Sequence, residues 1–89
     1  MTDAVISRLR DEIDGIDRDL LVAMNRRLEV VGLLHEHKVE HGIPLRDPGR
    51  EQSMLALLGE ANQGPLSAEG LAGFFRHVLD LTRRELHGE

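Results

Sequence analysis

The sequence predicts an all-α protein in which one long helix is followed by two shorter helices. Residues 6–41 contain no proline and repeat apolar side chains at steps of three and four, which is the period of a helix. Segments 41–44 and 62–65 combine glycine and proline and therefore divide the chain into three parts. No stretch alternates apolar and polar residues as a half-buried strand does. These observations favour helix-on-helix packing.

The long helix carries an apolar seam that is interrupted once, at Arg27. A guanidinium on an apolar seam is costly unless an anion meets it, because a buried charge must be paired or hydrogen-bonded. That anion is either a carboxylate of the protein or one of a ligand. The seam residues are Ile6, Leu9, Ile13, Ile16, Leu20, Ala23, Val30 and Leu34.

The length of this helix predicts an oligomer. About 36 residues at 1.5 Å each span about 54 Å, whereas a compact globule of this chain length is only about 30 Å across. The helix therefore does not fit inside its own monomer, and a twofold dimer is the commonest closed solution.

Local signals place the ends of the other helices. Gly42 provides a left-handed cap for the long helix. Asp47 before Pro48 has the form of an N-cap and a first-turn proline, which predicts a helix over residues 48–61. Ser67 can cap a third helix over residues 68–87, whose apolar face includes one hydroxyl, Thr82.

Composition limits the class of protein. We expect residues 1–89 to form one small domain in a soluble cytoplasmic protein, because no apolar run approaches the length of a membrane span and the N-terminus lacks a signal-peptide pattern. The absence of cysteine excludes disulfides and thiolate metal sites. The net charge of −5 and the two aromatic residues argue against binding to nucleic acid.

Three cations nevertheless lie on inward-facing positions, namely Arg27, Lys38 and Arg50. Each of them could instead form a structural ion pair with a carboxylate of the protein at the edge of the core. For any single cation, this structural role is as well supported as a functional role. Together they favour a site for a small polyanion, since guanidinium groups match carboxylates. Arg10 lies about 25 Å before Arg27 on the same helix, so only a partner chain could bring it to that site.

His37 and His41 have the spacing of helical metal ligands, and His35 lies nearby. A metal site needs a third ligand and supporting contacts, and neither is evident. We therefore interpret these histidines as surface residues.

The same residues resemble the all-helical, type II chorismate mutase family. The resemblance is carried by residues 9–17 (LRDEIDGID), Arg26-Arg27, Lys38 and residues 46–51 (RDPGRE), and it extends over nearly the whole chain. It implies an intertwined homodimer with three helices per chain, and an isomerase that converts chorismate to prephenate without metal or cofactor.

The resemblance also implies roles for individual residues. Arg27 and Arg10 of the second chain would bind the substrate carboxylates, and Arg50 would add a cationic contact. Lys38 would hydrogen-bond the ether oxygen. Asp47 and Glu51 would hold the region of the ring hydroxyl, and Thr82 stands where the family usually has serine near a carboxylate.

One position departs from the family pattern. Four residues after the serine position, the family usually has a glutamine that reaches the ether oxygen, and here this position is Leu86. Loss of one such donor costs on the order of 10²–10³ in rate in other enzymes. The departure predicts a low rate, a need for a partner protein, or a related substrate.

Four interpretations follow from these observations. The first is a chorismate mutase. The second is a regulatory module that binds chorismate or prephenate, or associates with the first enzyme of the shikimate pathway, since residues 47–51 and 62–65 resemble the subgroup linked to that enzyme. The third is an isochorismate pyruvate lyase or a 4-amino-4-deoxychorismate mutase. The fourth is a structural dimer in which Arg27 fixes helix register.

Overall fold

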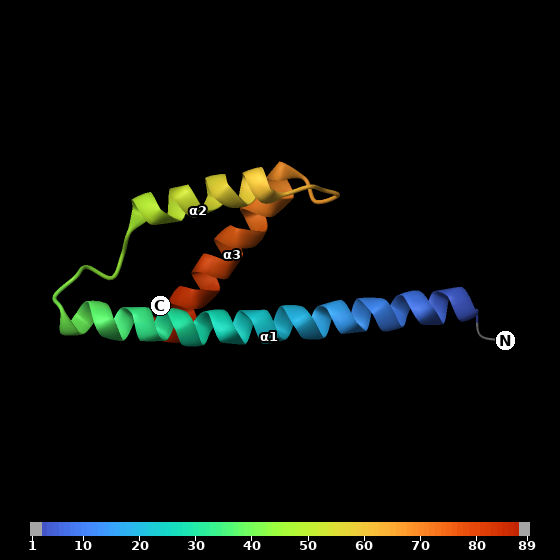
Figure 1. The fold of residues 1–89 in the computed structure, drawn as a ribbon, viewed down its shortest axis with the longest axis horizontal. Helices are drawn as coiled ribbons and strands as arrows, with labels where there is room; N and C mark the ends of the chain where they lie inside the picture. The colour runs from blue at the N-terminus through green and yellow to red at the C-terminus, as the bar shows by residue number, and fades with distance from the viewer. Residues whose placement is uncertain (1–2, 88–89) are drawn as a thin grey trace. The chain divides into compact units, whose positions relative to one another are not determined.

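The protein is built from three helices, described over residues 3–87 in a computed structural model (Figure 1). They are α1 (Ala4–Glu40), α2 (Pro48–Ala61) and α3 (Ala68–His87). The predicted all-α class is confirmed, and α2 and α3 have the predicted bounds. α1 begins at Ala4, just before the apolar repeat that starts at Ile6, because Asp3 caps it by accepting hydrogen bonds from the backbone N–H groups of Val5 and Ile6 at 2.8 and 3.3 Å. None of the described helices has the length and apolar character needed to cross a bilayer.

The remaining helix ends follow the predicted local chemistry. Gly42 has φ of 64°, and the Ile43 N–H donates to the carbonyl of Lys38 at 2.8 Å, which closes α1 with a left-handed cap. Asp47 caps α2 and is followed by Pro48 at the first helical position. Ser67 caps α3, where its Oγ accepts a hydrogen bond from the Gly70 N–H at 2.9 Å.

The chain divides into two compact units, Met1–Leu33 and Leu34–Glu89. Within the second unit, α2 packs on α3, and residues 62–67 join the two helices (Figure 1). Only three of the described residues are buried, namely Leu71, Val78 and Thr82, and all three belong to α3. A core of this size is small even for a chain of 89 residues.

The first unit is a continuous stretch of α1 whose apolar seam is exposed. The large seam residues of this unit are each 45–59% exposed, a high value for side chains that lie on one stripe of a helix. Contiguous apolar surface of this kind marks an interaction site in soluble proteins. These residues are Ile6, Leu9, Ile13, Ile16, Leu20 and Val30.

Two histidines connect the ends of helices within the second unit. The ring of His35, on α1, stacks on the ring of His87, on α3, with centroids 4.8 Å apart. His35 Nδ1 is buried and has no hydrogen-bond partner among the described residues, so the prediction of a surface position is wrong for this histidine. Burial lowers the pKa of His35, and the nearby charges of His87 and Lys38 lower it further. The folded chain therefore favours the neutral imidazole.

This contact predicts that the protein becomes less stable as the pH falls. Because the pKa of His35 is lower in the folded than in the unfolded chain, its stabilising effect is complete above the unfolded pKa of about 6.5 and is lost as the pH falls towards the folded value. We expect the urea midpoint of the wild type to decrease between pH 7.5 and 5.5, and His35→Gln to reduce this decrease. His77→Gln alters an exposed histidine of α3, and this variant should show the same decrease of the urea midpoint as the wild type. An equal pH dependence in all three proteins would contradict the assignment.

Candidate active site

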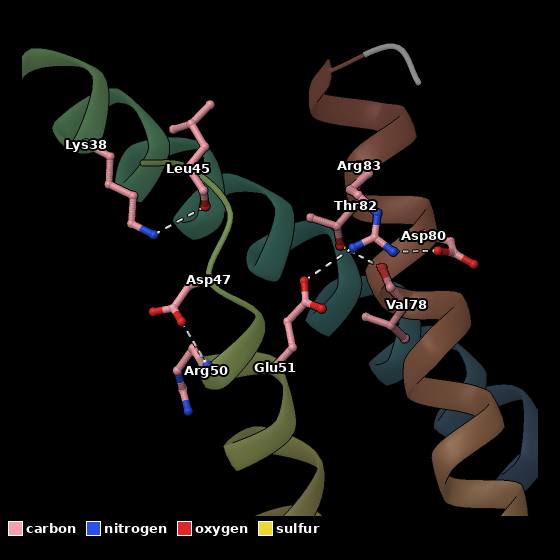
Figure 2. Close-up of polar contacts among 9 residues, drawn as sticks. All are labelled: Lys38, Leu45, Asp47, Arg50, Glu51, Val78, Asp80, Thr82 and Arg83. Atoms are coloured by element: carbon pink, nitrogen blue, oxygen red, sulfur yellow. Dashed lines mark hydrogen bonds and ion pairs between the residues drawn. The ribbon is translucent and has the colours of Figure 1, made fainter. Parts of the chain in front are cut away.

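The residues predicted to form the site fall into both units. Arg10 and Arg27 belong to the first unit, and the second unit contains the other six, which are Lys38, Asp47, Arg50, Glu51, Thr82 and Leu86. Figure 2 shows five of these six in the second unit, together with the residues that they contact.

Lys38 is half-buried near the end of α1 and is directed towards the segment that connects α1 to α2. Its Nζ donates a hydrogen bond to the backbone carbonyl of Leu45 at 3.4 Å (Figure 2). This long bond holds the ammonium beside the segment that leads to Asp47. Since an ammonium group has three N–H donors, it can also bind a second acceptor.

Asp47 and Arg50 are joined through the backbone at the start of α2. Asp47 Oδ1 accepts a hydrogen bond from the Arg50 N–H at 3.0 Å. The Arg50 guanidinium points away from α3 (Figure 2), and the residue is exposed in the single chain. The inward direction expected for Arg50 is therefore not seen within this chain. The cause is the rotation of α2, since the following residue, Glu51, is about 100° further round the helix and faces α3 instead.

Glu51 forms an ion pair with Arg83, a residue outside the predicted site. Arg83 Nη1 donates to Glu51 Oε1 at 3.3 Å, and Arg83 Nη2 donates to Asp80 Oδ1 at 2.6 Å (Figure 2). The only signal in the sequence was the spacing of three between Asp80 and Arg83, which is typical of an exposed pair on one helix. The contact with Glu51 depends on how α2 packs against α3.

Thr82 is the one buried polar residue in the described part of the chain. It is 6% exposed, and its Oγ1 donates to the carbonyl of Val78 at 2.7 Å. This bond to the residue four positions earlier is common for threonine within helices. It commits the hydroxyl proton to the backbone, so the oxygen can only accept a hydrogen bond from any further group.

Leu86 lies one turn beyond Thr82 on the same side of α3 and is half-buried. It offers no hydrogen-bond donor. Glu85, the neighbouring polar residue, is exposed.

A groove of about 380 Å³ lies between α2 and α3 beside the Glu51–Arg83 ion pair. Its walls are partly apolar and partly charged, so it suits a small amphipathic ligand better than a purely apolar one. The groove is lined by Pro48, Glu51, Gln52, Leu55, Arg76, Leu79, Asp80 and Arg83.

The two arginines of the first unit differ in their surroundings. Arg10 is exposed, whereas Arg27 is half-buried, and burial lowers the pKa of the Arg27 guanidinium. An arginine remains charged at neutral pH even so. Arg27 is therefore a partly desolvated cation on α1.

The other histidines form local contacts. The rings of His37 and His41 stack with centroids 4.1 Å apart, and His41 Nδ1 lies 2.9 Å from the carbonyl oxygen of His37. Within residues 3–87, no three side chains of the kinds that bind metal are grouped closely enough to hold an ion.

Comparison with known proteins shows that this chain is similar to T-proteins and to a 4-amino-4-deoxychorismate mutase. It is 45% identical over 53 residues to the T-protein of Enterobacter agglomerans and 38% identical over 72 residues to the T-protein of Haemophilus influenzae. It spans only 14% and 19% of the length of these two relatives. It is also 38% identical over 45 residues to the 4-amino-4-deoxychorismate mutase of Streptomyces venezuelae, of which it spans 44%.

Solved structures extend this similarity to the fold. Two structures of chorismate mutase from Thermus thermophilus, Form I and Form II, are each 32% identical in sequence to the chain. They match with TM-scores of 0.84 and 0.83, each covering 86% of this chain and 96% and 88%, respectively, of the Thermus chain. The family model for chorismate mutase type II matches residues 9–86. From the order and bounds of its helices, its sequence and this match, the chain belongs to the type II chorismate mutase family.

Proposed function

We propose that this chain is a chorismate mutase, an isomerase that converts chorismate to prephenate in the biosynthesis of aromatic amino acids. One observation carries the proposal: the family match over residues 9–86 includes every position that we assign to the site, from Arg10 to Leu86. The chain spans less than a fifth of the T-proteins that it matches, so we assign this reaction to the present domain, residues 1–89, and nothing further to it.

The reaction requires a substrate held in the right conformation and protein charges that stabilise its transition state. It does not require a reactive side chain. It is a unimolecular rearrangement in which one C–O bond breaks as one C–C bond forms within the same molecule. A protein can accelerate it by holding the substrate in a compact reactive conformer and by stabilising negative charge on the ether oxygen. Fixed cations in a site that excludes water supply both effects.

We assign the carboxylate-binding role to arginines of two chains. Arg27 and Arg50 of one chain, with Arg10 of the partner, would bind the two carboxylates of chorismate, since a guanidinium binds a carboxylate with two parallel hydrogen bonds. The position of Arg27 supports this role, because it is a half-buried guanidinium, and charge-assisted hydrogen bonds to a carboxylate are stronger in a partly desolvated place than in water.

The remaining assignments concern the rest of the substrate. Lys38, which is held beside the segment before α2, would donate to the ether oxygen as the C–O bond breaks. Asp47 and Glu51 would accept from the ring hydroxyl. Thr82 would lie beside a carboxylate-binding arginine, and Leu86 would close the pocket without donating a hydrogen bond.

The dimer is part of the same proposal. Seam residues of α1 that are 45–59% exposed need a cover, and a second copy of α1 presents the same apolar stripe. An antiparallel arrangement would carry Arg10 of each chain towards Arg27 of the other. We propose that this homodimer acts in the cytoplasm.

The similarity to a 4-amino-4-deoxychorismate mutase favours a second candidate activity on the amino analogue of chorismate. The two reactions are the same rearrangement on substrates that differ at one ring substituent, so Asp47 and Glu51 would decide between them. Identification of the product by mass after incubation with each substrate separates the candidates.

The leucine at position 86 supports a further alternative, in which the domain binds chorismate or prephenate but needs the first shikimate-pathway enzyme as a partner for turnover. Loss of chorismate should be measured for the purified chain alone and with that enzyme. Tight binding without turnover in both conditions would exclude the mutase.

The first activity prediction concerns the cations of the site. We expect Arg27→Ala and Arg50→Ala each to lower kcat/KM for chorismate more than about 100-fold, equivalent to about 3 kcal/mol, because each removes a contact with substrate charge. Arg8→Ala removes an exposed arginine of α1 and should change kcat/KM by less than about twofold. Wild-type turnover in either site variant would count against the assignment.

The second activity prediction tests whether the Arg10 in each site comes from the partner chain. Arg10→Ala and Arg27→Ala should each be nearly inactive, but a mixture refolded together should recover about a quarter of wild-type activity, because half of the dimers then contain one intact site. Arg27→Ala mixed with Arg50→Ala should recover nothing, since both residues come from the same chain. Recovery in both mixtures, or in neither, would refute a site shared in this way.

The third concerns Leu86. We expect Leu86→Gln to raise kcat about tenfold or more, because it adds a donor where negative charge develops. Leu81→Gln places the same amide on the exposed side of α3 and should leave kcat unchanged. An unchanged or lower rate in Leu86→Gln would mean that this side chain does not face the ether oxygen.

A further inference from the structure

We infer that Arg83 is a positioning residue, which holds the carboxylate of Glu51 in the orientation that the site requires. The inference rests on the proposed function, because it assigns Arg83 a role in the same reaction. Arg83 lies outside the motifs that carry the family resemblance.

The geometry distinguishes the Glu51–Arg83 ion pair from the other ion pairs. Among residues 3–87 there are three such pairs, and two of them join residues three apart on one helix. The pair between Glu51 and Arg83 alone joins two helices, across 32 positions of sequence. It therefore fixes a side chain of α2 relative to α3.

Arg83 is itself held in place from the side opposite Glu51. Asp80 accepts a hydrogen bond from one terminal nitrogen at 2.6 Å while the other donates to Glu51 at 3.3 Å. Because the guanidinium is planar and rigid, fixing one nitrogen determines where the other points. Asp80 thus sets the direction from which Arg83 meets Glu51.

We expect this arrangement to orient the carboxylate of Glu51 more than it stabilises the fold. The side chains of Arg83 and Glu51 are 33% and 29% exposed, and partly exposed ion pairs contribute little net free energy of folding. A glutamate side chain that loses its partner, however, regains rotational freedom and spends less time in any one direction. The contact involves only Oε1 of Glu51, and no described side chain bonds to Oε2, which leaves that oxygen able to accept from a substrate hydroxyl.

Electrostatic repulsion gives a second reason for a guanidinium beside Glu51. A carboxylate at the site of a dianionic substrate repels it, and a neighbouring guanidinium offsets that repulsion. Arg83 lies directly after Thr82, the buried threonine of the same turn, so it ties Glu51 to the part of α3 assigned to the site (Figure 2).

The test compares two arginines that are adjacent on α3. We expect Arg83→Gln to lower kcat/KM for chorismate about 10- to 100-fold, as displaced catalytic geometry does in other enzymes. Arg84→Gln removes an exposed positive charge from the next position and should change kcat/KM less than about twofold. Arg83→Lys should recover part of the loss, because an ammonium keeps the charge but not the rigid fork. Thermal melts at one protein concentration check that each variant is folded.

A double-variant cycle separates positioning from a general structural role. If Arg83 acts through Glu51, then Glu51→Gln with Arg83→Gln should have the same kcat/KM as Glu51→Gln alone. The inference is wrong if the decreases in kcat/KM caused by the two single substitutions multiply in the double variant. It is also wrong if Arg83→Gln retains activity within about twofold of the wild type. Asp80→Asn provides a milder variant should Arg83→Gln not fold, and it should lower kcat/KM severalfold while leaving both partner charges in place.

Failure of this inference differs from failure of the proposed function. An active wild type with a fully active Arg83→Gln rejects the positioning role and keeps the mutase. A wild type that leaves chorismate unchanged rejects the mutase and, with it, the role assigned to Arg83.

Discussion

The apolar seam of α1 is the constraint on which the rest of the structure depends. A helix of 37 residues extends about 55 Å, and the chain that carries it buries only three of its described side chains. So long a helix cannot be covered by two short ones, and the half-exposed apolar residues of its first unit are the result. In the proposed dimer, the same seam would provide the missing core and would bring the arginines of two chains to one substrate.

The helices could be predicted from the sequence because their ends are set by short-range chemistry. Asp47 before Pro48, Ser67 before α3 and Gly42 after α1 each act on backbone groups within a few residues. Such signals do not depend on what the helix packs against. The bounds of α2 and α3 were therefore predicted to the residue, and α1 differed only at its ends.

The site was harder to predict because it depends on packing between helices. The register of Arg50 with apolar residues predicts that it faces inward, yet in the single chain it is Glu51 that faces α3. Arg83 was missed because its partner lies 32 positions away, beyond any helical spacing. The family resemblance implies positions for the site but does not specify such contacts. The reaction also needs no nucleophile, so the sequence contained no reactive motif that could have indicated the chemistry by itself.

Asp47 has a consequence for how variants of this protein should be interpreted. Its carboxylate closes the first turn of α2 by accepting from the Arg50 N–H, and the same turn carries Glu51. Together with the bond from the Glu51 N–H to the Asp47 carbonyl, it holds the backbone from which the side chains of Arg50 and Glu51 project. Replacement of Asp47 by alanine would cost about 1 kcal/mol of helix stability through loss of the cap, so a change in activity of such a variant would combine an effect on the fold with any effect on substrate binding.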